Sequence, residues 1–298
     1  MRGDCPSRGP KRGFAGQGRL PPVGLIAGSG RPPFLVANGI RRSNRRVVVV
    51  GMRGFASPRL KDFADEFEWS GVTRMGAWIS TFKKHGVHEA VMIGGVRKQD
   101  MYSPLRVFRY IPDWRSACLW YFRIRKDKRD NAVLMAVADE LRQDGIELVS
   151  GVRYCKEHLA DEGLMTRTSV PRGAENDVEF GWRIARASAD LDIGQSIAVK
   201  ERDIIAVEAI EGTDAMIERA GQMCRVGGWT MIKVARPHQD MRVDVPTIGP
   251  STIRNLKDAK CACLVLEAGK TLIVDKPATL ALADRLKIAV VGRRQGAS

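Results

Sequence analysis

The first half of the chain alternates short apolar runs with longer stretches in which apolar residues recur at helical spacing. After Val72, apolar side chains recur at Met75, Ile79 and Phe82, and Gly86 ends this pattern, which predicts a capped helix. Four runs have the length and content of strands, at residues 23–27, 46–50, 91–93 and 146–149. Strands that alternate with helices pair in parallel, so this half predicts a doubly wound, Rossmann-like sheet.

The second half mixes paired strands with helices and is set apart by a polar stretch at residues 166–176. Its expected strands lie at residues 196–200, 204–207, 230–234, 261–266 and 271–274. Helical spacing is found at residues 178–189, from residue 213, and at residues 250–257 and 277–286. We therefore expect an α/β protein with two domains and a ligand in the cleft between them. The expected parts are a disordered basic tail over residues 1–22, an N-terminal Rossmann-like domain over 23–165, a linker over 166–176 and a C-terminal mixed α/β domain over 177–298.

Composition narrows the class of protein. No apolar run approaches the roughly 20 residues needed to cross a bilayer, and the Arg-rich, Gly-rich start lacks the apolar block of a signal peptide. The six cysteines are scattered without metal-finger or disulfide spacing, which fits a reducing cytoplasm. A net charge of +15 favours a polyanionic partner, which leaves nucleic acid, an anionic membrane face, a phosphorylated small molecule or a merely solvated surface.

Two glycine turns follow expected strands of the first half. Gly28, Ser29 and Gly30 stand where a strand leads into a helix, a position that can hold phosphate, although a tight turn without a ligand is the alternative. The dinucleotide fingerprint needs a third glycine where Pro33 stands, and this disfavours NAD. Gly94 and Gly95 end a neighbouring parallel strand, so both turns should emerge at one edge of the sheet.

Residues 106–129 combine eight basic residues with two acidic ones and six aromatic side chains. Such a mixture can stack on single-stranded bases or lie at a membrane interface, with rings at the acyl boundary and cations near the headgroups. The third interpretation is a pair of ordinary amphipathic helices whose aromatic side chains belong to the core.

Acidic residues gather at turns in the second half. Asp192, Glu208, Glu211 and Asp214 stand at expected strand ends or helix starts, and residues 240–247 add further carboxylates. Hard divalent cations prefer oxygen ligands of this kind and bridge them to substrate phosphates. Helix capping is the alternative and accounts for one such turn. Two nearby cations, Lys233 and Arg242, could neutralise phosphoryl oxygens.

Four segments are similar to one known family. They read GLIAGSG at residues 24–30, LDIGQ at 191–195, VEAIEGTDAM at 207–216 and RVDVPTIGPSTI at 242–253. From about residue 23 to residue 292 the chain resembles the LpxI family, the UDP-2,3-diacylglucosamine pyrophosphatases of lipid A biosynthesis. The resemblance implies two α/β domains and hydrolysis of UDP-2,3-diacylglucosamine to UMP and 2,3-diacylglucosamine 1-phosphate (lipid X). It also implies a divalent cation, usually magnesium, with manganese as the other candidate.

The resemblance also implies roles for individual residues. The family's key aspartate corresponds to Asp244, which would bind the metal or orient water. The expected catalytic set is Asp244, Asp214, Lys233 and Arg242, and the expected metal ligands are Asp244, Asp214 and Glu211. The expected substrate contacts are Gly28, Ser29, Gly30, Gly94, Gly95, Lys128, Asp192, Gln195, Gly212, Thr213 and Thr247. An acylated substrate further implies contact with the cytoplasmic face of the inner membrane and no nucleic acid partner, and it is compatible with a homodimer.

Two other function classes are weaker. A Rossmann-type oxidoreductase would need the glycine that Pro33 replaces. A non-enzymatic nucleic-acid-binding protein would explain the positive charge, but the acidic turns of the second half would repel the phosphate backbone.

Overall fold

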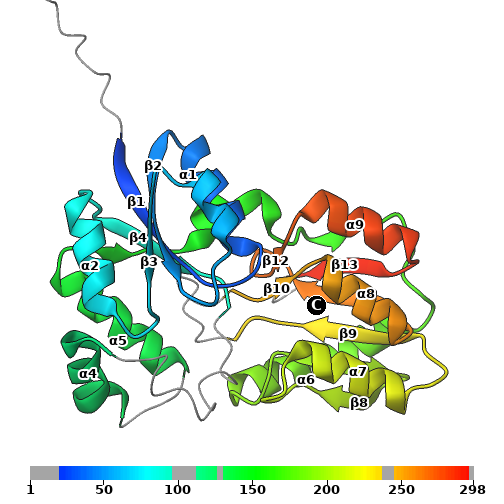
Figure 1. The fold of residues 1–298 in the computed structure, drawn as a ribbon. Coiled ribbons are helices and arrows are strands. Elements are labelled where there is room, and N and C mark those ends of the chain that lie inside the picture. The colour runs from blue at the N-terminus through cyan, green and yellow to red at the C-terminus, as the bar shows by residue number, and fades with distance from the viewer. Residues whose placement is uncertain (1–19, 96–111, 126–129, 237–244, 295–298) are drawn as a thin grey trace, which may run out of the picture.

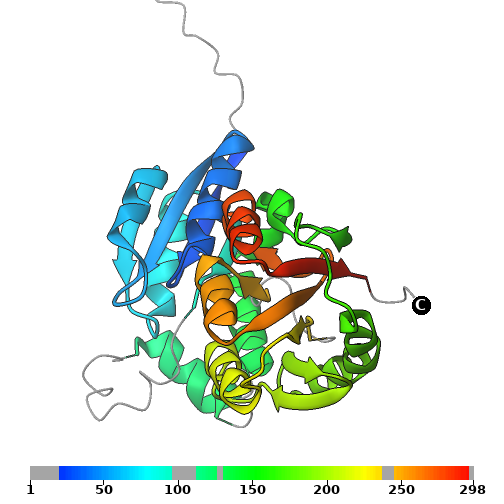
Figure 2. The ribbon, with the colours of Figure 1, turned by 90° about the vertical axis from the view of Figure 1, so that its right-hand side faces the viewer.

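Two α/β units, each built on its own main sheet, make up the chain (Figure 1). The computed structural model describes residues 20–95, 112–125, 130–236 and 245–294. Figure 2 shows the second unit from its own side, with its C-terminal strand, in dark red, within the sheet. The expected fold class, an α/β protein with a parallel N-terminal sheet and a mixed C-terminal sheet, is confirmed.

The sheet of the first unit is entirely parallel and has the strand order β3-β2-β1-β4-β5. The chain runs outward from β1 to β3 on one side and continues with β4 and β5 on the other side. This order makes the gap between β1 and β4 a topological switch point, where doubly wound sheets bind ligands. The strands are β1 (Leu20–Ala27), β2 (Arg45–Met52), β3 (Glu66–Ser70), β4 (Glu89–Ile93) and β5 (Glu147–Leu148).

Helices cover both faces of this sheet because its strands are apolar on both sides. On one face α1 (Pro32–Arg42), η1 (Pro58–Phe63) and η4 (Gly151–Tyr154) pack over Val23, Leu25 and Val49. On the other face α2 (Met75–Lys84) and α5 (Asp130–Gln143) pack over Ile26 and Val48. A short helix, α4 (Trp114–Leu119), continues into the π-helical turn η3 (Trp120–Ile124), and both lie beside α2 and α5.

The sheet of the second unit is mixed, in the order β6-β13-β11-β9-β7-β8. Three central strands are parallel, whereas β7 runs antiparallel to both of its neighbours and β6 antiparallel to β13. The strands are β6 (Gly163–Leu164), β7 (Ser196–Lys200), β8 (Asp203–Val207), β9 (Trp229–Lys233), β11 (Cys261–Glu267) and β13 (Ala289–Arg293). One face is covered by α6 (Ala174–Asp190), and the other by α7 (Thr213–Met223), α8 (Pro250–Asp258) and α9 (Lys276–Arg285).

The two units share apolar core. A two-stranded sheet of β10 (Thr247–Ile248) and β12 (Leu272–Ile273) lies where they meet. The side chains of Leu272 and Val274 pack in the core of the first unit, and Val245 packs against it. The short turn η5 (Lys156–His158) leads into this contact, where Leu159 bridges to Leu272.

An ion pair adds to the junction. The Arg31 guanidinium donates two hydrogen bonds of 3.2 Å to the carboxylate of Asp275, the residue directly before α9. Such two-pronged pairs fix orientation as well as adding attraction. The turn that follows β1 is therefore tied directly to the second unit.

Some elements of the fold were not predicted from the sequence, and others differ from their predicted bounds. β1 begins at Leu20, which pairs with Arg45, so the strand includes three residues assigned to the basic tail. β3 was missed because two glutamates alternate with Phe67 and Trp69 on this edge strand. β13 was missed although the apolar run at residues 288–291 marks it. Since β6 pairs within the second sheet, residues 163–164 lie with the second unit, while the linker over 166–176 stays a prediction.

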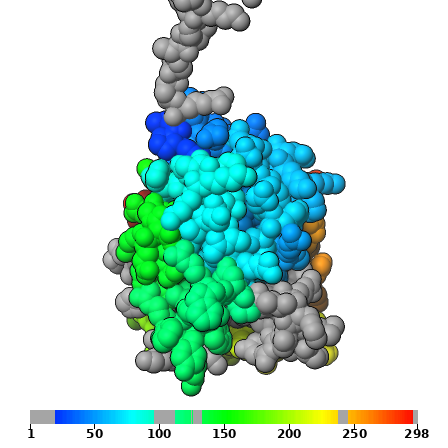
Figure 3. Space-filling model, turned by 60° about the vertical axis from the view of Figure 1, so that its left-hand side comes forward, coloured from blue at the N-terminus to red at the C-terminus, as the bar shows by residue number. Residues whose placement is uncertain are grey.

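The interpretation of the basic and aromatic stretch as core helices is wrong for its described rings. Leu119 is buried, but Trp114, Trp120, Tyr121 and Phe122 are exposed. Leu119 packs into the core beside residues of α2 and α5, whereas the four rings lie at the surface. Figure 3 shows this segment in green on the lower face of the molecule.

A carboxylate of α9 fixes the chain segment that leads into α6. Asp284 accepts hydrogen bonds from the backbone N–H groups of Arg167 and Thr168 and from the Thr168 hydroxyl. The backbone hydrogen bond from Thr168 is the largest cause that lowers the pKa of this carboxyl from its usual value near 3.8. We expect Asp284→Ala to lower the free energy of unfolding by about 1 kcal/mol at neutral pH, as loss of a capping carboxylate does.

This loss should depend on pH. A carboxyl whose pKa is lower in the folded than in the unfolded protein stabilises the fold above its unfolded pKa and loses that effect as the pH falls through its folded pKa. The difference between Asp284→Ala and the parent chain, measured by urea unfolding, should therefore shrink below pH 4. Asp258→Ala, at the exposed end of α8, is the control and should change little.

Candidate active site

Polar side chains converge at the carboxyl edge of the second sheet. Lys233 ends β9, Glu208 follows β8, and Ser196 begins the antiparallel strand β7, so all three meet at one edge. The register places Ser196 directly opposite Lys233. Because parallel strands end at a common edge, residues distant in sequence become neighbours here.

Lys233 is the centre of this cluster. Its Nζ donates to the Ser196 hydroxyl at 3.1 Å and to the Thr213 hydroxyl at 2.9 Å, and it lies 4.0 Å from Glu208 Oε2. Thr213 in turn donates its hydroxyl to Glu208 Oε1 at 2.8 Å. We call Lys233, Ser196, Thr213 and Glu208 the lysine cluster.

The two charged side chains of the lysine cluster are buried, so water screens their charges only weakly. Lys233 is 2% exposed and Glu208 is 7% exposed. A buried ammonium is tolerated only with charged or hydrogen-bonding partners, and the carboxylate and two hydroxyls supply them. A cation held rigidly in this way is suited to an anionic ligand, since its partners are already oriented before the ligand arrives.

Two buried side-chain oxygen atoms at this edge of the sheet can still accept a hydrogen bond. Among the described residues, no donor hydrogen-bonds to Glu208 Oε2 or to the side-chain oxygen of Gln195, the residue before Ser196. Buried acceptors are normally satisfied, so such exceptions mark places where a ligand or water donates. The cluster therefore offers an ammonium and two acceptors at one strand edge.

The outer carboxylates of this edge are engaged elsewhere. Asp214 accepts a hydrogen bond of 3.0 Å from the Asn255 side chain, and Asp192 pairs with Arg236 at 2.8 Å. Glu211 pairs with Arg219 at 2.5 Å. The pKa of Glu211 is lowered, first by a hydrogen bond from its own backbone N–H and then by the one from Arg219.

The described residues do not by themselves form a metal centre. No group of three or more Asp, Glu, His or Cys side chains within residues 20–95, 112–125, 130–236 and 245–294 is arranged to hold an ion. Of the expected ligands, Asp214 and Glu211 are bound to Asn255 and Arg219. The third, Asp244, lies outside the described residues.

Other expected site residues have varied placements. Arg242 and Lys128 also lie outside the described residues. Gly212 directly precedes α7, and its φ of +84° is a conformation that glycine adopts without strain. Thr247 lies on β10, and its hydroxyl donates to the Val245 carbonyl at 2.8 Å, so it is near the junction of the two units.

The glycine turns of the first sheet do meet, but they bind each other. Gly28 N–H donates to the Ile93 carbonyl, and Ser29 and Gly95 exchange backbone hydrogen bonds of 2.9 and 3.1 Å. The Ser29 hydroxyl also donates to the Gly95 carbonyl at 2.8 Å. Because these N–H groups already donate to carbonyl groups of the protein, they are not available to bind a phosphate. We call the hydrogen-bonded turns of Gly28, Ser29 and Gly95 at the switch point the glycine clasp.

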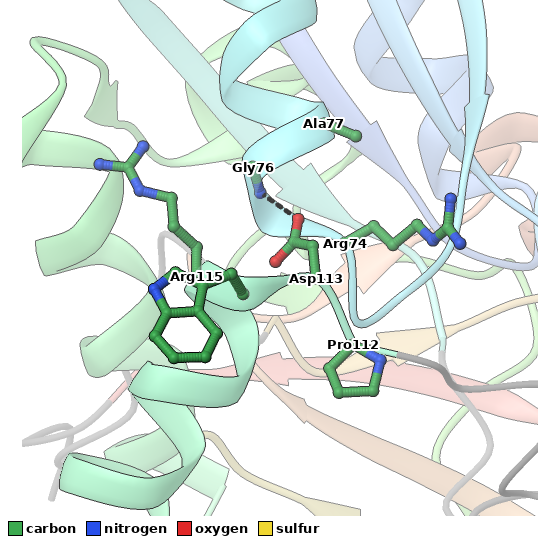
Figure 4. Close-up of a pocket in the computed structure, with 7 residues that line it drawn as sticks. Arg74, Gly76, Ala77, Pro112, Asp113 and Arg115 are labelled. Carbon is green, nitrogen blue, oxygen red and sulfur yellow. Dashed lines mark hydrogen bonds between the residues drawn. The ribbon is translucent and has the colours of Figure 1, made fainter.

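A separate surface pocket of about 540 Å³ lies at the start of α2 (Figure 4). Its carboxylate, Asp113, accepts hydrogen bonds from Gly76 N–H at 2.7 Å and from Ser116 N–H at 2.8 Å. The negative charge at this helix start is thus supplied by the protein itself, which removes the reason for an anion to bind. We place the candidate site at the lysine cluster and not in this pocket.

Lys233, Thr213 and Gln195 were anticipated from the sequence, and Glu208 was among the candidate carboxylates for a divalent cation, whereas Ser196 had no predicted role. Glu208 carried a signal, since it directly follows an apolar strand. Ser196 carried none, because its position depends on the pairing of β7 with β9.

Each of the two units matches a domain of one known protein family. The LpxI N-terminal domain matches residues 22–158, and the LpxI C-terminal domain matches residues 161–291. The chain belongs to the LpxI family. Its lysine cluster lies in the part that matches the C-terminal domain, and the glycine clasp lies in the part that matches the N-terminal domain.

One curated relative extends over nearly the whole molecule. The protein named UDP-2,3-diacylglucosamine pyrophosphatase LpxI, from Caulobacter vibrioides, is 33% identical over 282 residues. The match covers 91% of this chain and 96% of the relative. The likeness to this member of the LpxI family thus includes both units.

The glycine clasp should tolerate no side chain. A Cβ at Gly28 would lie 2.7 Å from the Gly94 carbonyl oxygen and 2.8 Å from that of Gly95, and backbone atoms cannot easily yield. Gly28→Ala should therefore lower the free energy of unfolding by about 1–3 kcal/mol, measured by urea unfolding. Gly71→Ala is the matched control, since its Cβ would first meet Arg74 Cγ at an ordinary 3.5 Å; equal losses in both variants would contradict the clasp.

The lysine cluster should show strong coupling. Glu208→Gln leaves the Lys233 ammonium buried without its carboxylate and should lower the free energy of unfolding by about 2 kcal/mol. The exposed Glu218→Gln on α7 is the control and should be near neutral.

A double-mutant cycle separates coupling from simple loss of packing. In the double variant Glu208→Gln with Lys233→Met, no unpaired charge remains buried, so most of the lost stability should return. If the double variant instead loses as much stability as the two single variants added together, the pair does not interact.

Proposed function

We propose that this protein hydrolyses the pyrophosphate bond of UDP-2,3-diacylglucosamine, giving UMP and 2,3-diacylglucosamine 1-phosphate in lipid A biosynthesis. The observation that carries the proposal is the buried Lys233 ammonium at the carboxyl edge of the second sheet, in a chain that belongs to the LpxI family throughout. The relative's name supports the substrate.

The chemistry follows from the charge of a diphosphate. Water attacks one phosphorus, a new P–O bond forms, and the bond to the bridging oxygen breaks, so negative charge builds on the leaving phosphate. Lys233 offsets this charge, and its partners Ser196, Thr213 and Glu208 hold its ammonium in place. Asp244 accepts the proton of the attacking water or orients it, and Arg242 adds a second cation.

The substrate contacts divide between the units. Gln195, Thr213 and Asp192 lie at the edge that holds Lys233, and Thr247 lies at the junction. The turn of Gly28 to Gly30 would face the substrate without donating the Gly28 and Ser29 N–H groups, which already bond to Ile93 and Gly95. This turn directly precedes Arg31, whose guanidinium reaches Asp275 of the second unit. These contacts support a substrate held between the two units.

A divalent cation, magnesium or manganese, is part of the proposal. It would supply charge neutralisation for the diphosphate. The described carboxylates do not complete a site, so Asp244 would have to contribute to it, and we assign no reaction step to the ion.

We also propose a cytoplasmic location at the inner membrane face, where a doubly acylated substrate resides. No helix among the described residues is both long and apolar enough to span a bilayer. The five described cysteines are free, and burial raises the pKa of Cys155 and Cys263 to about 12, so these two thiols are unreactive near neutral pH.

The direct test is release of UMP from UDP-2,3-diacylglucosamine in the presence of magnesium. We expect Asp244→Ala to lower kcat by about 10²–10³-fold, the scale of a lost major electrostatic contact. A chelator should abolish release, and added magnesium should restore it. Asp258→Ala, an exposed carboxylate of α8, should retain parent turnover.

The outcomes separate the parts of the proposal. No UMP from the parent chain would reject the reaction itself. Normal turnover of Asp244→Ala would reject its role alone, and turnover that survives the chelator would reject the metal alone.

A further inference from the structure

A short projecting segment of the first unit exposes aromatic side chains. Trp114 is 83% exposed, Phe122 67%, Tyr121 60% and Trp120 47%. Large rings rarely lie in water together unless they meet a partner. Figure 3 shows this segment on the lower face of the molecule, beneath the cyan helix α2.

The segment is held firmly to the unit that carries it. Asp113 hydrogen-bonds to N–H groups of both α2 and α4, and Ser116 accepts a further hydrogen bond of 3.1 Å from Met75 N–H. Leu119 is buried in the core, and Arg115 pairs with Glu140 of α5 at 3.2 Å. The rings are therefore presented by an ordered helix and not by a loosely attached loop.

Cations surround the rings. Arg125 lies over the Tyr121 ring at 5.4 Å, and Arg123 is half exposed beside Asp139 of α5. The described part of this segment, residues 112–125, has three arginines and one aspartate, within a chain of net charge +15. This surface would attract an anionic partner, over a distance that becomes shorter as the ionic strength rises.

The geometry at Tyr121 disfavours base stacking on that ring. Stacking needs an open ring face, but the Tyr121 ring packs at right angles to the Phe122 ring, with centroids 5.1 Å apart, and Arg125 lies over it. Trp and Tyr rings with neighbouring arginines are instead typical of the boundary between acyl chains and headgroups, where an apolar body and a polar end are both satisfied.

We propose that Trp114, Trp120, Tyr121, Phe122, Arg123 and Arg125, which we call the aromatic patch, dock on an anionic lipid bilayer. The rings enter the headgroup boundary while the guanidinium groups stay at the phosphates. This inference rests on the proposed function, because that function supplies the lipid substrate. It adds the surface by which the protein meets the membrane.

The test is sedimentation of the full chain with vesicles of phosphatidylcholine containing about one third phosphatidylglycerol. Removing two rings in Trp114→Ser with Phe122→Ser should lower the partition coefficient at least about tenfold. The control is Met223→Ser with Val226→Ser, which removes two similarly exposed apolar side chains, 66% and 88%, from the end of α7. The control should sediment like the parent chain.

A charge variant tests the electrostatic part. Arg125→Glu should weaken sedimentation with anionic vesicles, and vesicles of phosphatidylcholine alone should bind the parent chain less than anionic ones. Added salt should reduce the difference between the two vesicle types.

Three results would overturn the proposal: no sedimentation of the parent chain, equal sedimentation of the ring variant, or a parent dimer that the ring variant converts to monomers. The last result would assign the aromatic patch to a second copy of the chain. UMP release from detergent-dispersed substrate, measured on the same variants, is independent of vesicles. Its absence in all of them would reject the proposed function without bearing on the aromatic patch.

Discussion

Parallel β-strands cannot be joined by tight turns, and this constraint decides where the chemistry of the molecule lies. Each parallel strand is followed by a crossover that begins at the same edge of the sheet. In the second sheet this edge collects Lys233 and Glu208, and the antiparallel strand β7 brings Ser196 to the same edge. In the first sheet it brings two glycine turns together at the switch point. A buried ammonium could not be satisfied by residues from one strand alone, because neighbouring side chains of a strand point to opposite faces.

The local elements were predictable because local spacing produces them. Most helices and the apolar strands appear where the apolar period indicates, and the family resemblance rests on motifs at the ends of those elements. β3 was missed because its alternating glutamates hide a half-buried edge strand, whereas β13 was missed although its apolar run at residues 288–291 is as long as that of other predicted strands.

The site was predictable only in part because its contacts are not local. Lys233 and Thr213 could be named from the sequence, but the hydrogen bond between them joins residues 20 positions apart, and that to Ser196 spans 37 positions. The same limit applies to the glycine turns. Their position at one edge was foreseeable, whereas the mutual use of their N–H groups depends on the distance between β1 and β4. The exposure of the aromatic rings likewise depends on which side of a short helix faces α2 and α5.

The packing of Leu272 and Val274 into the first unit also bears on how the molecule can open. Any rotation that parts the units has to withdraw these two side chains into water, at a cost of about 3–5 kcal/mol. An open arrangement is then a minor population in the absence of ligand, and a ligand that favours it must bind it more tightly by a comparable margin. The two halves are thus coupled in unfolding through these two side chains, although each main sheet keeps a core of its own.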